Sequence, residues 1–348
     1  MSLLALQSLE VGRVCAKRWR ADGVVEPYGS IVWWRPRESH AVVDIESLAA
    51  ALERLEVRPD LCVVRGTLVD QDAKRIRRAM QGDGAGLSDG DRSWMCCDLD
   101  TLETTPELRA QLRDNPWGGL ELAARFAVSL LPEWLRDVSC VAQWSQSAGR
   151  DGYARAKLHL WFWLDRPVCC ASLAAWSSTV DALDPSVCRP VQPIYTSRPI
   201  IEDGWAFGPT RRTMLVGGSR PIAACPDVLQ SSDAWQAEKK ARDDERASRA
   251  AMWAAADKYR TPLARASRAA RRMDAVVRSA LAEMAAAPES RRHGTLMRSA
   301  AAIARTAHDL GVDPMNDLVA LAGVAKARLP SDRAHEPAAA IEYVLRTL

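Results

Sequence analysis

The sequence predicts an α+β protein in which a front region of mixed strands and helices is followed by an all-helical region. Apolar residues recur at both strand and helix spacing before residue 230, and all nine cysteines lie at or before Cys225. Residues 236–348 hold 31 alanines in 113 positions, and alanine has the highest helix propensity. The length of 348 residues suggests about two domains.

Strand and helix candidates alternate along the front region. Ile45, Leu48, Leu52 and Leu55 recur at helical spacing, which predicts an amphipathic helix over 44–56. Further helices are predicted over 120–131, ending before Pro132, and over 171–183. Apolar runs predict strands over 31–34, 61–64, 94–98, 138–144, 158–164 and 213–216. The Gly- and Ser-bearing segment 145–155 is suited to join two neighbouring strands as a long hairpin.

The charge of the chain divides where its composition changes. Residues 236–348 carry a net charge of +6, whereas the rest of the chain carries −3. A basic helical region points to a polyanionic partner. Residues 236–249 have almost no apolar stripe, which predicts a solvated linker helix.

Composition and missing motifs exclude several classes of protein. The apolar runs are far shorter than the ~20 residues that span a bilayer, and no signal peptide precedes them, so we expect a soluble, cytoplasmic protein with no membrane partner. An odd number of cysteines without a CxxC pair indicates reduced thiols, with no zinc site. The P-loop, GxSxG and HExxH patterns are missing, which argues against a helicase motor, an esterase and a zinc protease.

A pair of carboxylates follows a buried strand at Asp98-Leu99-Asp100. Positions i and i+2 of a strand share a face, so the two carboxylates are expected side by side. Like charges ~4 Å apart repel by about 4 kcal/mol at an effective dielectric of 20. A divalent cation removes this penalty, and Mg²⁺ prefers oxygen ligands. The alternative is a strand end whose two aspartates are simply solvated.

A histidine lies within the apolar strand 158–164. His159 shares its face with Trp161 and Trp163, and it needs a polar partner if it is buried. It is either a site residue or a core histidine bonded to a backbone carbonyl. The preceding Ser145 and Ser147 suit contact with phosphate or sugar, although Ser and Gly are also ordinary hairpin residues.

Two further features are candidates for the same chemistry. Asp184, before Pro185, is either a turn former or the third carboxylate of a two-metal site. Arg211 and Arg212 precede the predicted strand 213–216. Guanidinium groups bind phosphate oxygens bidentately, but the pair also suits a solvated strand entrance.

The order of these motifs resembles the archaeo-eukaryotic primase superfamily, specifically the primase-polymerases of plasmids, phages and integrated elements. The resemblance covers roughly residues 90–218. It includes the stretches 144–149 (WSQSAG) and 191–199 (VQPIYTSRP) around the His159 strand and Asp184. It implies an RRM-like catalytic core on a mixed or antiparallel sheet within a catalytic domain of residues 1–230. A charged linker, 231–262, and a helix-bundle domain, 263–348, would follow.

The resemblance also implies roles for particular residues. Asp98, Asp100 and Asp184 would be catalytic and bind two Mg²⁺ or Mn²⁺ ions, and His159 would contact the triphosphate of the incoming nucleotide. Lys157 stands where many members have serine. We count it as a nucleotide contact with the residues named above: Ser145, Ser147, Arg211 and Arg212.

The alanine-rich tail resembles the helix bundles that follow such cores and hold single-stranded template and an initiating nucleotide. The segment 290–298 opens a helix of this tail. The candidate nucleic-acid contacts are Arg268, Arg271, Arg272, Arg291, Arg292 and Arg298. A plain basic helix surface is the alternative.

The resulting hypothesis is a DNA primase that builds primers on single-stranded DNA from NTPs or dNTPs by two-metal nucleotidyl transfer. A helicase or replication protein would act in trans. Two alternatives remain open: a metal-dependent glycosyltransferase with a DxD motif, and a non-catalytic replication initiator that binds DNA through the tail.

Overall fold

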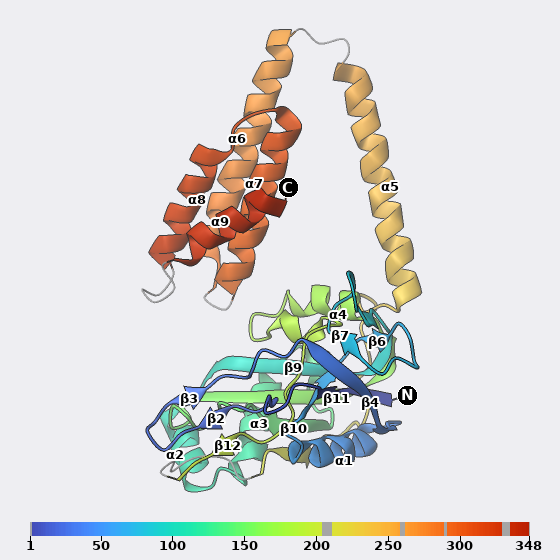
Figure 1. The fold of residues 1–348 in the computed structure, drawn as a ribbon, viewed down its shortest axis with the longest axis vertical. Helices are drawn as coiled ribbons and strands as arrows, with labels where there is room; N and C mark the ends of the chain where they lie inside the picture. Colours follow the sequence, from blue (N-terminus) through green and yellow to red (C-terminus); the bar gives the residue numbers. More distant parts are fainter. Residues whose placement is uncertain (1, 204–210, 258–261, 289–290, 329–334, 348) are drawn as a thin grey trace. The chain divides into compact units, whose positions relative to one another are not determined.

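The computed structural model describes residues 2–203, 211–257, 262–288, 291–328 and 335–347. The chain divides into two compact units, Met1–Ala241 and Arg242–Leu348. The described residues form a mixed α+β first unit with antiparallel sheets and a helical second unit, which confirms the predicted fold class at this level (Figure 1). The boundary between the units falls within one long helix, α5 (Ser232–Asp257).

The first sheet has the strand order β5-β1-β4-β7. Its strands are β1 (Ser2–Ser8), β4 (Trp33–Ala41), β5 (Leu61–Val64) and β7 (Ile76–Arg77), and β1 pairs antiparallel with both of its neighbours. The strand predicted over 61–64 is confirmed. The one predicted over 31–34 begins two residues later and runs on to Ala41.

Helix α1 (Ile45–Glu56) confirms the helix predicted from apolar spacing. It begins at a capping box, in which Asp44 Oδ1 accepts from the Ser47 backbone N–H at 2.7 Å and Ser47 Oγ lies 3.1 Å from the Asp44 backbone N–H. Its buried face includes Leu48 and Leu52, which are both fully buried.

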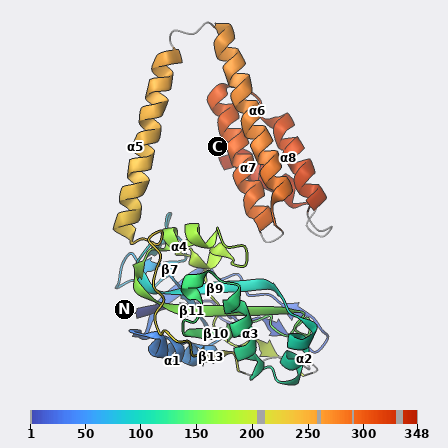
Figure 2. The same cartoon turned by 180° about the vertical axis from the view of Figure 1, so that it is seen from behind.

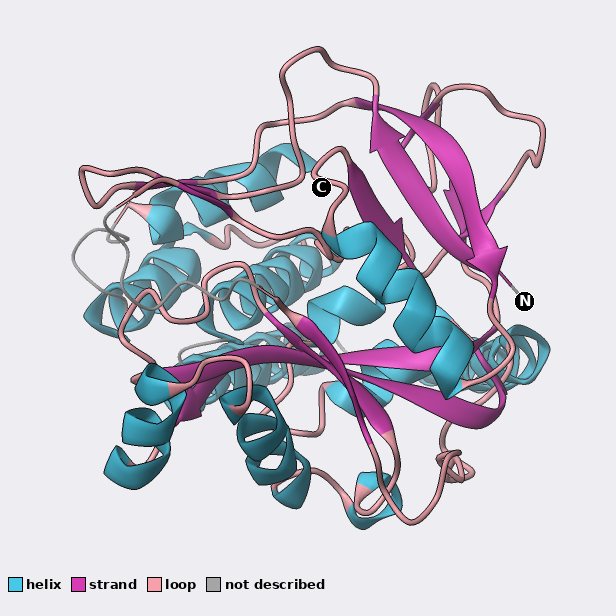
Figure 3. Cartoon of the chain, turned by 90° about the horizontal axis from the view of Figure 1, so that it is seen from below, coloured by secondary structure: helices cyan, strands magenta, loops and turns pink. Residues whose placement is uncertain are grey.

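The second sheet carries the candidate motifs and has the order β13-β10-β11-β9. All three strand pairings are antiparallel. The strands are β9 (Arg92–Glu103), β10 (Cys140–Trp144), β11 (Arg155–Val168) and β13 (Thr213–Val216). The predicted hairpin over 145–155 joins β10 to β11. The twisted arrows of these strands are seen from below in Figure 3.

Helices cover this second sheet. Helix α3 (Gly119–Ser129) packs across β10, β11 and β13, as Figure 2 shows, and α2 (Pro106–Asp114) precedes it. Helix α4 (Cys170–Ser177) is shorter than the predicted 171–183. The reason is local, because the hydroxyls of Ser178 and Thr179 donate to the carbonyls of Ala175 and Trp176 and satisfy the last turn.

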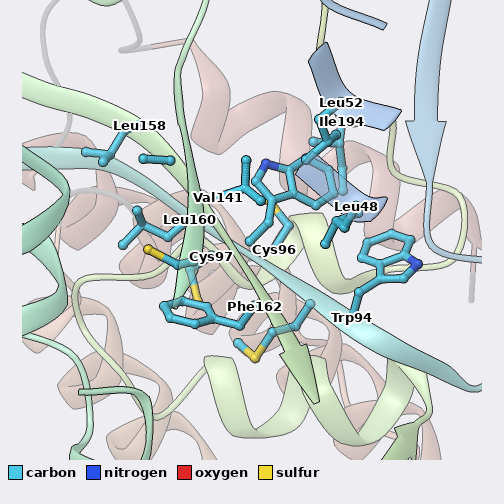
Figure 4. Close-up of a cluster of buried hydrophobic side chains, with 14 of the residues drawn as sticks. Leu48, Leu52, Trp94, Cys96, Cys97, Val141, Leu158, Leu160, Phe162 and Ile194 are labelled. Atoms are coloured by element: carbon cyan, nitrogen blue, oxygen red, sulfur yellow. The ribbon is translucent and has the colours of Figure 1, made fainter. Parts of the chain in front are cut away.

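The main core covers both faces of the second sheet and includes residues of α1 and α3. Figure 4 shows Leu48 of α1 beside Trp94 of β9 and Leu52 of α1 beside Ile194, with Leu160 and Phe162 of β11 in the same cluster. Burying a side chain of this size stabilises the fold by roughly 1.5–3 kcal/mol. This rigid core supports the strands that carry the candidate site.

Short elements complete the first unit. They are the strands β2 (Arg18–Trp19), β3 (Val25–Glu26), β6 (Thr67–Leu68), β8 (Leu87–Ser88) and β12 (Ile200–Ile201), and the 3₁₀ helices η1 (Glu133–Leu135) and η2 (Pro185–Cys188). Strand β12 pairs in parallel with β2, and this brings the segment after η2 to the N-terminal part of the chain.

The second unit is helical. Helices α6 (Pro262–Ala286), α7 (Arg292–Leu310), α8 (Met315–Arg328) and α9 (Glu336–Thr347) bury a core that includes Met284, Leu296, Ile303, Leu318 and Leu321. By contrast, the described side chains of α5 from residue 236 to 252 are exposed. Within the described part of the chain, none of the helices has the length and apolar character needed to cross a membrane.

Candidate functional site

One cavity of about 190 Å³ in the first unit gathers six of the nine predicted catalytic and nucleotide-binding residues. Its walls come from segments that lie far apart in the sequence. The lining residues are Lys17, Tyr28, Asp98, Asp100, Ser145, Gln146, Ser147, His159, Asp184, Ser186, Val187, Gln192, Pro193, Ile194 and Tyr195. The three predicted carboxylates therefore face one space.

Strand β9 delivers the first two carboxylates. Leu99 is fully buried in the core, so the alternation of the strand turns Asp98 and Asp100 to the opposite face, toward the cavity. Asp98 is paired in register with His159 on β11. The predicted shared face is confirmed, and the histidine is the direct cross-strand neighbour of the first aspartate.

A backbone hydrogen bond fastens the third carboxylate to the first. The Asp184 N–H donates to the Asp98 carbonyl oxygen at 3.0 Å. The Asp184 carboxylate caps η2, because Oδ1 accepts from the Ser186 N–H and Oδ2 accepts from Ser186 Oγ, each at 2.8 Å. Asp184 is thus a turn former that also lines the cavity, and its role as a metal ligand stays a prediction.

The Asp98 carboxylate lies in an unfavourable environment for a negative charge. Its side chain is 13% exposed, and Oδ1 is buried without a hydrogen-bond partner among the described residues. Burial raises the pKa of Asp98 well above its ordinary value, and the charges of Asp100 and Asp184 raise it further. Lys17 and Lys157 act in the opposite direction. The site therefore favours added positive charge.

The tautomer of His159 follows from its neighbour Gln143. The Gln143 amide nitrogen donates to Thr213 Oγ1 at 3.0 Å and to the Thr196 carbonyl at 3.4 Å. A carbonyl only accepts, so the amide oxygen of Gln143 must be the atom 3.4 Å from His159 Nδ1. The proton of a neutral ring then lies on Nδ1, and Nε2 presents a lone pair.

His159 is neutral at physiological pH. Burial lowers its pKa to about 3, and the charges of Arg212 and Lys17 lower it in the same direction. Its Nε2 lies 3.5 Å from Asp98 Oδ1. Two electron-rich atoms that face each other in a buried site are stabilised by a proton or a cation between them.

These residues fit a divalent cation in part. The partnerless oxygen of Asp98, with Asp100 on the same strand face, is a ligand set that hard cations prefer. Among the described side chains, however, no group of three acidic, histidine or cysteine residues is gathered closely enough to hold a metal ion. Both oxygens of Asp184 are engaged by Ser186.

Sequence reasoning missed the wall formed by the N-terminal segment. The Tyr28 and Tyr195 rings stack with centroids 3.6 Å apart, and Lys17 Nζ lies 5.3 Å from the centroid of Tyr28. Lys17 acts electrostatically on both Asp98 and Asp100. The short strands β2 and β3 around Lys17 carry no motif, so only the tertiary contacts identify this wall.

Gln146 holds the N-terminal segment at the cavity. Its side chain is 2% exposed, and its amide accepts from the Lys17 N–H and donates to the carbonyls of Cys15 and Ser197. Its own carbonyl accepts from Trp19 Nε1 at 3.0 Å. This residue lies between the two predicted serines and fixes the position of Lys17.

Three predicted nucleotide contacts lie outside the cavity lining. Lys157 is half-buried and near enough to influence the charge of Asp98. Arg211 is exposed, with its guanidinium 4.1 Å from the ring centroid of Trp117. Arg212 is fully buried and donates to the backbone carbonyls of Trp144, Thr196 and Ser197, so its guanidinium is used inside the protein.

The six arginines predicted to bind nucleic acid lie on or beside α6 and α7. The side chain of Arg268 lies outside the described residues. Arg271 is exposed, and Arg272 is 3.5 Å from Asp309. Arg291 is half-buried, Arg292 donates to the carbonyl of Arg328, and Arg298 donates to Thr295 Oγ1 at 3.1 Å. Among these candidates, Arg271, Arg272 and Arg298 are exposed, whereas Arg291 and Arg292 are half-buried.

Comparisons with protein-family models, with curated proteins and with solved structures gave no match for this chain. The residues of the cavity therefore carry the functional interpretation. The features that bear on it are the three carboxylates, the neutral imidazole and the lysine at the wall.

Proposed function

We propose that the chain is a primase-polymerase that transfers nucleotides onto a primer or initiating nucleotide along single-stranded DNA. One observation carries the proposal. Asp98, Asp100 and Asp184 line a single cavity with His159, although 86 residues separate the first from the last. The order of these residues along the chain resembles that of the archaeo-eukaryotic primase motifs. The antiparallel sheet β13-β10-β11-β9 with its covering helices is compatible with the RRM-like core of that superfamily.

The three carboxylates would hold two Mg²⁺ or Mn²⁺ ions. When bound, such ions supply activation of a 3′-hydroxyl and stabilisation of the charge on the leaving pyrophosphate. The partnerless Asp98 oxygen and the mutual repulsion of the carboxylates support this assignment. Asp184 joins such a set by exchanging its contacts with Ser186 for a cation.

The remaining residues of the cavity bind and orient the nucleotide. Lys17 supplies positive charge for the triphosphate, and Lys157 adds to it from beyond the lining. The hydroxyls of Ser145 and Ser147 are suited to donate to phosphate or sugar oxygens. His159 acts as a neutral group whose Nε2 faces the carboxylates. Catalysis by such a site consists mainly of positioning and charge stabilisation.

The proposed substrates are an NTP or dNTP and a single-stranded DNA template, within the cytoplasm and with a helicase or replication protein in trans. The basic second unit is proposed to contribute sequence-tolerant phosphate contacts. Its alanine-rich helices and net positive charge support this role, and Arg271, Arg272 and Arg298 are exposed.

The test is incorporation of a labelled nucleotide on single-stranded DNA with Mg²⁺ or Mn²⁺. The full chain is expected to form metal-dependent products, the Asp98→Asn variant none, and the Asp114→Asn variant, which alters an exposed carboxylate on α2, normal amounts. Hydrolysis of a sugar nucleotide in place of incorporation would identify a glycosyltransferase. DNA binding without any incorporation by the wild-type chain would identify a non-catalytic initiator.

A further inference from the structure

A basic surface lies at the edge of the first sheet, where β4 pairs with β7. Trp33 is opposite Arg77, and Trp34 is opposite Ile76. Trp34 and Ile76 are buried, so the alternation of β4 turns Trp33, Arg35 and Arg37 to the other face. Arg35, Arg37 and Arg77 are all exposed. This basic surface consists of Trp33, Arg35, Arg37, Arg75 and Arg77.

The guanidinium of Arg75 is held against an aromatic ring. Its central carbon lies 3.7 Å from the ring centroid of Trp33. Gly84, at φ +71°, approaches the edge of the same ring so closely that a Cβ there would lie 2.8 Å from it. A stacked guanidinium keeps its planar donors for a ligand, and it loses less conformational freedom on binding than a mobile side chain.

The arginines of this surface have no carboxylate partner among the described side chains. Arg37 donates to the Gln7 amide oxygen, and Arg77 donates to the Asp83 carbonyl. Other arginines of the same unit are ion-paired, namely Arg13, Arg18, Arg20 and Arg58. Residues 1–235 carry a net charge of −3, so this basic surface stands out from its surroundings.

We propose that this surface binds the phosphodiester backbone of single-stranded nucleic acid. Residues i and i+2 on a strand are about 6.6 Å apart, so Arg35 and Arg37 form a linear array of guanidinium groups. Such an array suits a linear polyanion better than a single anion, and guanidinium binds phosphate bidentately. The charges of this surface are sufficient to predict phosphate binding. Only the identification of its ligand as the template strand rests on the proposed function.

The basic surface is connected to the candidate site through β7. Arg78 follows Arg77 and has the opposite orientation, with its guanidinium 5.1 Å from the Trp34 ring centroid. It donates to the Val191 carbonyl at 2.6 Å. Val191 directly precedes Gln192, which begins the cavity wall that ends at Tyr195. The basic surface and the contact to the cavity wall therefore come from adjacent residues, Arg77 and Arg78.

The test is fluorescence anisotropy of a labelled oligo(dT) with the full chain in EDTA, at several salt concentrations. A triple variant, R35A/R37A/R75A, is expected to bind at least about tenfold more weakly. The slope of log K against log salt should fall by about 2, since each lost phosphate contact accounts for roughly 0.7 on a single strand. The control R13A/R58A/R125A removes three exposed, ion-paired arginines of the first unit and should match the wild type.

A crosslink and a competitor add independent readouts. An oligonucleotide with 5-bromodeoxyuridine should crosslink to the peptide that contains Trp33. The proposal is overturned if the triple variant matches the control in affinity and slope, or if polyglutamate displaces the oligonucleotide equally well at equal charge, which would indicate an acidic protein partner.

These outcomes are distinct from failure of the proposed function. Asp98→Asn should bind oligo(dT) with the wild-type slope and incorporate nothing, and R35A/R37A/R75A should incorporate nucleotide with a KM for template raised at least about tenfold. A wild-type chain that binds DNA at this surface but incorporates no nucleotide would remove the proposed catalysis and leave the surface intact.

Discussion

The two units of the chain place their candidate functional residues in opposite ways. In the first unit the cavity joins Lys17, Asp98, Gln146 and Asp184, which are distant along the chain and meet only through tertiary contacts. In the second unit the candidate arginines lie on or beside two helices, at least partly exposed to solvent where described. A site for chemistry needs fixed geometry, whereas a phosphate-binding surface needs charge.

The buried polar groups follow the same division. The first unit buries ionisable side chains, including Glu56, Arg65, His159 and Arg212, and satisfies most of them with backbone partners. Among the described residues of the second unit, the buried polar side chains are the hydroxyls of Thr295, Ser299 and Thr306. Substitutions should therefore be far more costly in the first unit.

The largest expected difference concerns carboxylates. Asp100→Asn is expected to lower nucleotide incorporation at least about 10³-fold. The fold should stay intact, because Asp100 is exposed and the substitution removes only its charge from the cavity. Asp309→Asn, which removes the partner of Arg272 in the second unit, should leave incorporation within about threefold of wild type. Primer extension at saturating nucleotide measures the activity of both variants. Equal losses of activity would contradict the claim that the chemistry takes place in the first unit.

Next in size is the effect of the buried guanidinium on stability. Arg212→Met is expected to destabilise the first unit by about 3–5 kcal/mol, because the buried carbonyls of Trp144, Thr196 and Ser197 lose their guanidinium donor. Arg272→Met should cost less than about 0.5 kcal/mol. Urea unfolding followed by tryptophan fluorescence reports the first unit, which holds all but one of the thirteen tryptophans. A small loss for Arg212→Met would show that its contacts are dispensable.

Gln146→Ala should destabilise the same unit by about 1–3 kcal/mol, since the Lys17 N–H and the Cys15 and Ser197 carbonyls lose a buried partner. Gln236→Ala, on the exposed surface of α5, is the matched control and should be neutral. The same urea titration measures both variants. Equal stability of the two would mean that the N-terminal segment holds its place without Gln146.

The smallest effect on activity is expected for Lys17→Met, which keeps the aliphatic stem and removes the charge. KM for the nucleotide should rise about tenfold, the size of one lost charge-assisted contact, with kcat changed less. Arg18→Met, at the exposed neighbouring position, should leave KM unchanged. A fall in kcat alone would mean that Lys17 has no part in binding the nucleotide.

Local patterns predicted the elements of the first unit better than the full site. The spacing of Ile45 to Leu55 predicted α1, and the alternation around Leu99 predicted that Asp98 and Asp100 share a face. These features depend only on neighbours along the chain. Lys17 and Tyr28 were not predicted, because contacts across more than 100 residues place them at the cavity.

The arginine pair shows the same limit at one strand entrance. Neighbouring residues of an extended chain face opposite sides, so one of Arg211 and Arg212 had to point inward. The sequence does not reveal which one, or that the inward residue finds the carbonyls of Trp144, Thr196 and Ser197. Helix α4 was overestimated for a similar reason, because Ser178 and Thr179 end it with local hydrogen bonds.

The claim that Asp98 binds a divalent cation is tested most directly by unfolding of the wild type and Asp98→Asn with and without Mn²⁺. In EDTA at neutral pH the variant should be the more stable, because burial and neighbouring charges raise the pKa of Asp98 and its ionised form costs stability as pH rises above the unfolded value. Mn²⁺ at about 100 times its Kd should stabilise the wild type by about 2.7 kcal/mol and the variant hardly at all. Equal stabilisation of both chains, or none of the wild type, would contradict a metal site at these carboxylates.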